Sequence, residues 1–198
     1  DRALKLDSAK LNAGTWSKRA RQLCEEEGGE TIWRSYGGFY FSPSQSLIFD
    51  SLLKTLPEDK TPRTVCLAAL ISAASQCAAS PGHTAQPFSP TRTAGRYLRE
   101  AWLRNPFDYI RKSLAYLCLR HAKKEGAARI ADANVVAPSL QENDLVFLDP
   151  PYSGVHYSRF YHVLETIARG QCGKVEGSGR YPPPSERPTS AYSQRGKS

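Results

Sequence analysis

The stretch "DLVFLDPPY", residues 144–152, joins an apolar run to an acidic residue, two prolines and a tyrosine. Short apolar segments bounded by turn residues are typical of parallel strands buried on both faces. Pro150 and Pro151 have no backbone N–H to give to a neighbour, so we expect a strand that stops at Asp149. Ligands of open parallel sheets bind beyond the carboxyl ends of the strands, which makes Asp149 a candidate site residue.

The chemical groups expected at this strand end fit a planar base that bears an amino group. Asp149 offers a carboxylate acceptor, Pro150 a carbonyl acceptor in a fixed direction, and Tyr152 an aromatic face. The two N–H groups of adenine's amino group match the two acceptors, and stacking on the ring contributes about 1–3 kcal/mol per base. A base inside a duplex cannot reach such a pocket and must be flipped out. The alternative is a Pro-rich turn closed by a packing tyrosine.

Length and composition bound the remaining possibilities. The chain has 198 residues, enough for one domain with a sizeable core or two small ones. Its formal charge of +8 favours an acidic partner such as nucleic acid, the alternative being charge that serves solubility. The five cysteines and four histidines lack metal-ligand spacings, so we expect no metal site and reduced thiols in the cytoplasm. No signal peptide or apolar run long enough for a membrane span is present.

Helix signals are clearest in the middle of the chain. Ser42 is a candidate N-cap before Pro43, and Thr61 before Pro62 repeats the pattern for a helix reaching about Ala79. Further helices are predicted at 96–103, 106–124 and 158–169. The first 30 residues have too few apolar positions for a helix prediction, and "TIWRSYGGFYF" (31–41) is predicted to be a loop leading into an extended segment.

The hydrophobic pattern changes after residue 125. "ARIADA" (128–133) and "DLVFLD" (144–149) are predicted strands, and the tail is rich in Pro, Gly, Ser and Arg. We therefore expect a mostly helical region at 1–125, and at 126–198 part of an α/β domain that ends in a surface loop or a disordered tail.

Several stretches resemble one enzyme family. "DPPY" after an apolar strand resembles the catalytic motif of methyltransferases that act on N6 of adenine in DNA. "GGFYFSPSQSLIFDSL", "YSRFYHVLETIARG" and "GRYPPPSERPTSAYS" are similar to segments of the D12 class, the Dam-like and FokI-type adenine methylases. The resemblance extends over about residues 33–195 and is strongest at 144–169.

The resemblance implies a class I (Rossmann-like) α/β methyltransferase fold with a largely helical insertion for target recognition. It implies S-adenosyl-L-methionine as methyl donor and Asp149, Pro150, Pro151 and Tyr152 as the catalytic motif. It also places Asp132 and Ala133, together with Asp149, next to the donor; the alternative for Asp132 is the cap of a turn.

One motif of the family was not found in this sequence. The Gly-rich F-x-G-x-G motif, which holds the methionine end of the donor, has no counterpart, and the chain begins at Asp1 and contains no methionine. We therefore expect a partial chain with an incomplete sheet, which binds the donor poorly and is inactive alone.

The same resemblance places target recognition between residues 30 and 125. Residues 92–129 carry ten basic and three acidic side chains, which suits contacts to phosphates; the alternative is a solvated helix face. The candidate DNA-binding residues are His83, Arg92, Arg96, Arg111, Lys112, Tyr157 and Arg159. Tyr157 or Tyr161 is a candidate for lining the base pocket, and His162 is expected to be a packed, hydrogen-bonded histidine.

The predicted function is site-specific N6-adenine methylation of double-stranded DNA within restriction–modification or host defence. The expected protein is a cytoplasmic monomer that contacts no membrane and has a cognate restriction endonuclease as a further partner. Two alternatives remain open: the same chemistry on N4 of cytosine or on RNA, and a non-catalytic DNA-binding module.

Overall fold

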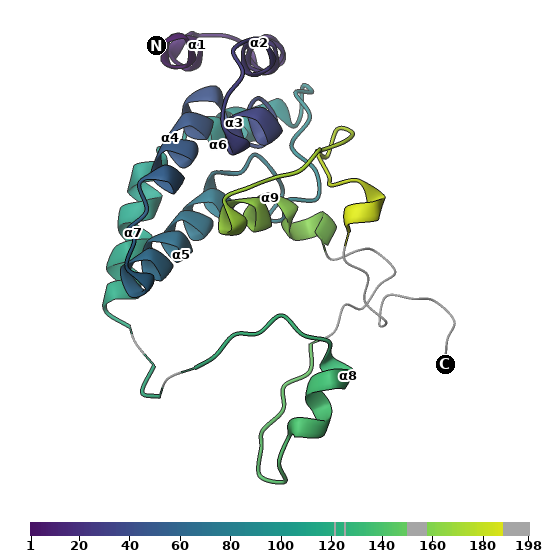
Figure 1. The fold of residues 1–198 in the computed structure, drawn as a ribbon. Helices are drawn as coiled ribbons and strands as arrows, with labels where there is room; N and C mark the ends of the chain where they lie inside the picture. Colours follow the sequence, from purple (N-terminus) through teal and green to yellow (C-terminus); the bar gives the residue numbers. More distant parts are fainter. Residues whose placement is uncertain (121, 125, 150–157, 188–198) are drawn as a thin grey trace.

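The structure, a computed structural model, describes residues 1–120, 122–124, 126–149 and 158–187 (Figure 1). These residues are mainly helical and contain no β-strand; two isolated bridges join Gly37 to Phe41 and Glu176 to Tyr181. The elements are α1 (Arg2–Ser8), α2 (Ala13–Glu26), α3 (Thr31–Tyr36), α4 (Pro43–Lys54), α5 (Lys60–Cys77), α6 (Gly95–Leu103), α7 (Pro106–Cys118), α8 (Ala133–Val136), η1 (Ala137–Ser139), α9 (Ser158–Arg169) and η2 (Pro184–Glu186).

The main core lies between α3, α4, α5 and α9 (Figure 1). Tyr36 and Phe49 are fully buried there, and α9 adds Val163 and Ile167, which are also inaccessible to solvent. Because buried apolar side chains are the main source of folding free energy, α9 is an integral part of this helical body.

A second core joins α2 to α6. The indole rings of Trp16 and Trp102 meet edge to face, with centroids 5.0 Å apart, and Ala20 and Leu98 pack beside them. Such aromatic contacts add about 0.5–1.5 kcal/mol to the effect of burial. The N-terminal helices are thereby fixed to the segment that follows the Pro-rich loop at 80–94.

Several predicted helices are confirmed. Ser42 caps α4 in a reciprocal capping box with Gln45, and α9 spans the predicted residues 158–169. Helix α6 begins one residue earlier than predicted, at Gly95. Helix α7 ends at Cys118, well before the predicted residue 124. The Thr61 cap is wrong, because Asp59 is the N-cap residue of α5 and Thr61 lies inside the helix.

The loop predicted to begin at residue 31 is also wrong, since Thr31–Tyr36 forms α3, and α1 and α2 lie where no helix was predicted. The start of α3 depends on a tertiary contact, which the local sequence does not show. The Asp50 carboxylate of α4 accepts hydrogen bonds from the backbone N–H groups of Ile32 and Trp33, each at 2.8 Å. The first turn of α3 is thus capped from a distant helix, which local sequence patterns do not reveal.

The predicted sheet stays a prediction. Residues 144–149 form no strand in the structure; Leu145 is fully exposed and Phe147 is 88% exposed. Residues 128–132 are likewise irregular and exposed, and α8 begins at Ala133. A strand needs neighbours that accept and donate its backbone hydrogen bonds, and the described residues provide none for these segments. The α/β fold and the division at residue 125 therefore remain expectations.

The tail beyond α9 is anchored as far as it is described. The Tyr40 hydroxyl donates to the carbonyl of Gly179 at 2.9 Å, and the Tyr181 hydroxyl donates to that of Ala85. Arg180 donates to the Ser35 carbonyl at 2.8 Å. The tail up to residue 187 therefore packs against the helical body. Within the described ranges, no helix has the length and apolar character needed to cross a bilayer.

Candidate functional site

Of the DPPY motif, Asp149 belongs to the described residues, and helix α9 follows the motif along the chain. Asp149 is exposed and ends the apolar run, and α9 begins at Ser158. Pro150, Pro151, Tyr152 and Tyr157 lie outside the described residues. The nearest described element after the motif is α9, and the site is therefore built from the residues around this helix.

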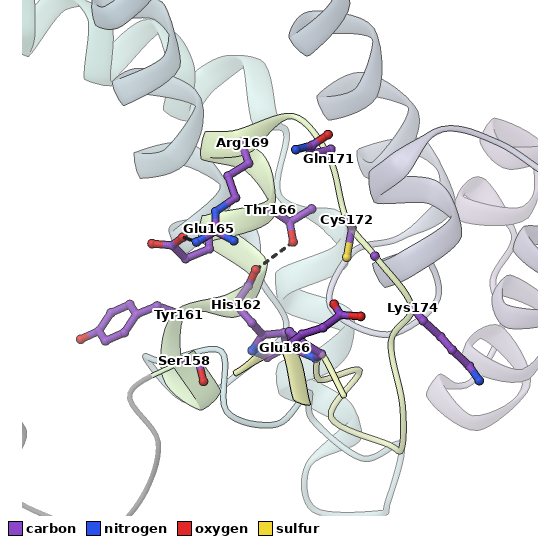
Figure 2. Close-up of a pocket in the computed structure, with 12 residues that line it drawn as sticks. Ser158, Tyr161, His162, Glu165, Thr166, Arg169, Gln171, Cys172, Lys174 and Glu186 are labelled. Atoms are coloured by element: carbon purple, nitrogen blue, oxygen red, sulfur yellow. Dashed lines mark hydrogen bonds and ion pairs between the residues drawn. The ribbon is translucent and has the colours of Figure 1, made fainter. Parts of the chain in front are cut away.

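A cavity of about 370 Å³ lies along α9 (Figure 2). One wall consists of α9 residues from Ser158 to Arg169, and the other comes from residues 171–174 with Pro182 and Glu186. Tyr161 lines the cavity and is 42% exposed; its predicted place in a base pocket stays a prediction. The cavity is within the size range of small-molecule sites.

A buried hydrogen-bond network supports the α9 wall. The Thr166 hydroxyl donates to the His162 carbonyl at 2.9 Å (Figure 2) and lies 2.8 Å from the Tyr36 hydroxyl. Burial raises the pKa of Tyr36, so this hydroxyl stays protonated and able to donate. The network joins α9 to α3 and fixes the floor of the cavity.

His162 is the buried, hydrogen-bonded histidine that the sequence predicted. Its ring nitrogens lie 3.2 Å from the Arg159 carbonyl and 3.0 Å from the Gly179 carbonyl. Burial lowers the pKa of His162, which favours the neutral ring. A neutral imidazole donates from one nitrogen only, so one of these two carbonyls accepts its hydrogen bond.

The charged groups of the cavity balance one another. Glu165 and Arg169 form an ion pair at 2.8 Å, and Lys174 and Glu186 contribute one charge of each sign (Figure 2). A cavity with two acids and two bases has no net attraction for a phosphate. Its carboxylates accept hydrogen bonds and the ring of Tyr161 offers a flat face, which suits a neutral, polar, planar ligand.

The predicted donor-binding residues lie elsewhere. The Asp132 side chain caps α8 by accepting a hydrogen bond from the Asn134 N–H at 2.8 Å, which was the alternative reading of this residue. Asp132, Ala133 and Asp149 are all exposed, and none of them lines the α9 cavity. The described residues therefore do not bring the three predicted donor-binding residues into the α9 cavity.

The predicted DNA-binding residues fall into three groups. Arg92 and Arg96 line a groove at the start of α6. Arg111 and Lys112 are exposed on α7, where Arg111 pairs with Asp108 at 3.3 Å.

The third group contacts or belongs to α9. The exposed His83 packs edge to face on Phe160, and Arg159 donates to the Tyr181 hydroxyl at 3.2 Å. The structure thus brings together Arg92 with Arg96 and His83 with α9, but not the full predicted set.

The candidate DNA-binding residues left out two basic residues of the groove, although Arg99 was among the ten basic side chains counted at 92–129. Lys10 and Arg99 line it together with Arg92 and Arg96. Arg99 follows Arg96 by three residues, a spacing that places both on one side of a helix and was visible in the sequence. Lys10 reaches the groove only through the packing of α2 on α6, so no local signal identifies it.

A comparison with protein families gives one match. The model for the D12 class N6 adenine-specific DNA methyltransferases matches residues 85–182. Over this range the chain belongs to that family. The matched D12 residues include α6, α7, Asp149 with the DPPY motif, and α9, whereas α1–α5 lie outside the match. Comparisons with curated proteins and with solved structures gave no match.

Membership of the D12 class connects the chain to methyl transfer onto adenine in DNA. DNA is the substrate that the family implies, and methyltransferases of this kind typically use S-adenosyl-L-methionine. The family resemblance predicted from the DPPY motif is thereby confirmed.

Proposed function

We propose that the protein transfers a methyl group from S-adenosyl-L-methionine to N6 of a specific adenine in double-stranded DNA. The observation that carries the proposal is the D12 family match, which includes Asp149 and the following Pro-Pro-Tyr directly before α9. Restriction–modification or host defence, with a partner endonuclease, is the proposed setting. The proposed fold is a class I α/β sheet to which the apolar runs at 128–133 and 144–149 contribute strands.

In this proposal the motif holds the amino group of an extruded adenine. The Asp149 carboxylate accepts one hydrogen bond from the amino group and the Pro150 carbonyl accepts the other, while Tyr152 stacks on the ring. These bonds draw electron density toward the nitrogen, which makes it a better nucleophile. Positioning and electrostatics then supply most of the catalysis, and no covalent enzyme intermediate is required.

We propose that the α9 cavity contacts a part of the base other than the amino group, because Asp149 does not line this cavity. It is a cavity whose wall begins six residues after Tyr152, and its balanced charge suits a neutral ring. Tyr161 offers the flat face for this ring. The base must be flipped out of the duplex, because inside the duplex the amino group of the adenine is held in a base pair.

The methyl donor supplies an electrophilic methyl group when it is bound. Because Asp132 and Asp149 are exposed and line no part of the α9 cavity, we expect residues 1–198 alone to bind this donor weakly and to show little activity. Isothermal titration of the chain with S-adenosyl-L-methionine measures this. Tight binding would contradict the expectation.

The decisive experiment uses the full-length protein and its Asp149→Ala variant. Transfer of a labelled methyl group to duplex DNA is measured together with DNA binding, and the modified nucleoside is identified by mass spectrometry. We expect N6-methyladenine with the wild type and a loss of methylation with retained DNA binding in the variant. An unchanged rate in the variant would refute the role of Asp149. N4-methylcytosine or methylated RNA would move the activity to another acceptor, and DNA binding without methylation by the wild type would indicate a non-catalytic module.

A further inference from the structure

A cationic groove lies between the start of α2 and the start of α6. It has a volume of about 760 Å³ and is lined by residues 10–14 on one side and by residues from 90 to 99 on the other. Four of its lining residues are cationic, namely Lys10, Arg92, Arg96 and Arg99, and none of its lining residues is acidic. We call this feature the basic groove.

The charges of the basic groove are not neutralised by carboxylates. In the described part of the chain none of the four cations forms an ion pair, whereas the neighbouring Arg104 pairs with Glu100 at 2.8 Å. Lys10, Arg92 and Arg96 are exposed. Like charges gathered in one concavity repel one another and raise the local concentration of anions, so the groove favours an anionic ligand.

One of the four cations, Arg99, joins the two walls of the groove. Arg99 donates a hydrogen bond to the Leu11 carbonyl and its guanidinium lies 5.6 Å from the ring centroid of Trp16. A Cβ added to Gly95 would come within 2.9 Å of the Ala13 Cβ, so the two helices approach as closely as a glycine permits. The groove is therefore part of the packed α2–α6 contact.

One of the exposed cations, Arg96, is also held in place. The Arg96 guanidinium lies 4.5 Å from the Tyr97 ring centroid and donates to the Tyr97 hydroxyl at 2.5 Å, which fixes its plane. A second hollow of about 340 Å³, lined by Arg92, Thr93 and Arg96, extends the surface. Cations that are already positioned lose less conformational freedom when they bind a ligand.

We propose that the basic groove binds the phosphodiester backbone of duplex DNA, and that residues 10–14 are part of this interface. The proposal rests on the proposed function, for which duplex DNA is the substrate. Each DNA strand carries one charge about every 3.4 Å, so four cations in one groove match several successive phosphates. Such contacts set the position of the protein on the duplex and carry no sequence information.

This inference extends the DNA interface beyond the part of the chain that matches the family. Lys10 and its neighbours precede the matched residues 85–182, whereas Arg92, Arg96 and Arg99 lie inside them. It also separates two tasks, because the α9 cavity has balanced charge and the basic groove has only positive charge. The cavity suits a base and the groove suits a backbone.

The test measures binding of the full-length protein to a short fluorescent duplex by anisotropy, in a salt series without methyl donor. The variants are Lys10→Gln and the double variant Arg92→Gln with Arg96→Gln. Arg99 is left intact because it holds Leu11. We expect the slope of log affinity against log salt to decrease by about one for each cation removed, and affinity at low salt to fall about tenfold or more in the double variant.

A charge-matched control is the double variant Lys60→Gln with Arg63→Gln. Both residues are exposed in the first turn of α5 and lie outside the basic groove. This control should keep the salt slope of the wild type. Circular dichroism of each variant checks that the helices are retained.

The possible outcomes separate this inference from the proposed function. Unchanged salt slopes in both groove variants would overturn the groove and leave the methylation assay untouched. Failure of the wild type to bind any duplex DNA would overturn both. Tighter binding to an RNA duplex of the same sequence would overturn DNA as the ligand of the groove.

Discussion

Ile167 of α9 and Phe147 of the apolar run before the DPPY motif are both large apolar residues, yet Ile167 is fully buried and Phe147 is 88% exposed. Helix α9 satisfies its own backbone hydrogen bonds and needs only apolar neighbours, which α3 and α5 supply. A strand depends on adjacent strands for its backbone partners, and the described residues offer none to the segment 144–149. The difference shows that α9 has its packing partners among the described residues, whereas the predicted strand at 144–149 has none there.

The sharpest way to test this contrast is to remove apolar atoms from each region. Ile167→Ala should lower the free energy of unfolding by about 2–5 kcal/mol, because it leaves a cavity in the main core. Phe147→Ala should change it by less than about 0.5 kcal/mol, since an exposed side chain loses little on truncation. Urea unfolding of the full 198-residue chain gives both values. A loss of several kcal/mol in Phe147→Ala would show that the apolar run is buried.

A second comparison concerns two aspartates next to helix N-termini, Asp50 of α4 beside the first turn of α3 and Asp59 before α5. Asp50 is buried and accepts the N–H groups of Ile32 and Trp33, whereas Asp59 precedes α5 and makes no side-chain capping bond. Asp50→Ala should cost about 2–3 kcal/mol of stability, because two N–H groups lose a charged acceptor. Asp59→Ala should cost well under 1 kcal/mol. Equal midpoints for the two variants in urea would contradict the capping of α3 by Asp50.

The smallest expected effect is the pH dependence that His162 adds to the helical body. Burial lowers its pKa in the folded state, and the charge of Arg187 acts in the same direction. The folded state therefore binds fewer protons than the unfolded state between the lowered pKa and the ordinary value near 6.5. Stability is full above about pH 6.5 and falls as the pH drops below it.

Thermal unfolding across this pH range measures the effect. His162→Gln should remove this part of the pH dependence, although it also alters a packed site. His83→Gln changes an exposed histidine outside the network and should keep the dependence. The same slope in wild type and His162→Gln would mean that other groups cause it.

Prediction from sequence succeeded where the signal was local. The capping residues of α4 and the apolar stripe of α9 lie within their own segments, and both helices were predicted with their start residues. It failed at α1, α2 and α3, whose stability comes from distant partners. Trp16 packs on Trp102, and the Asp7 carboxylate accepts from Ser42 and Ser44 of another segment.

The candidate site shows the same division. The family was readable from the sequence, because the residues of the DPPY motif at 149–152 are adjacent in the chain. The basic groove was only half visible, since Arg92 and Arg96 are close in sequence but Lys10 joins them through the α2–α6 contact.

The sequence by itself determined the family, the capped helices and the chemistry offered by Asp149 and its neighbours, since these depend on residues that are adjacent or one helical turn apart. The tertiary structure alone decided that the N-terminal residues become helices, that His162 is locked against the tail, and that four cations meet in one groove. The physical reason is that packing joins side chains far apart in the chain, and its energy exceeds the weak local preferences of short polar segments.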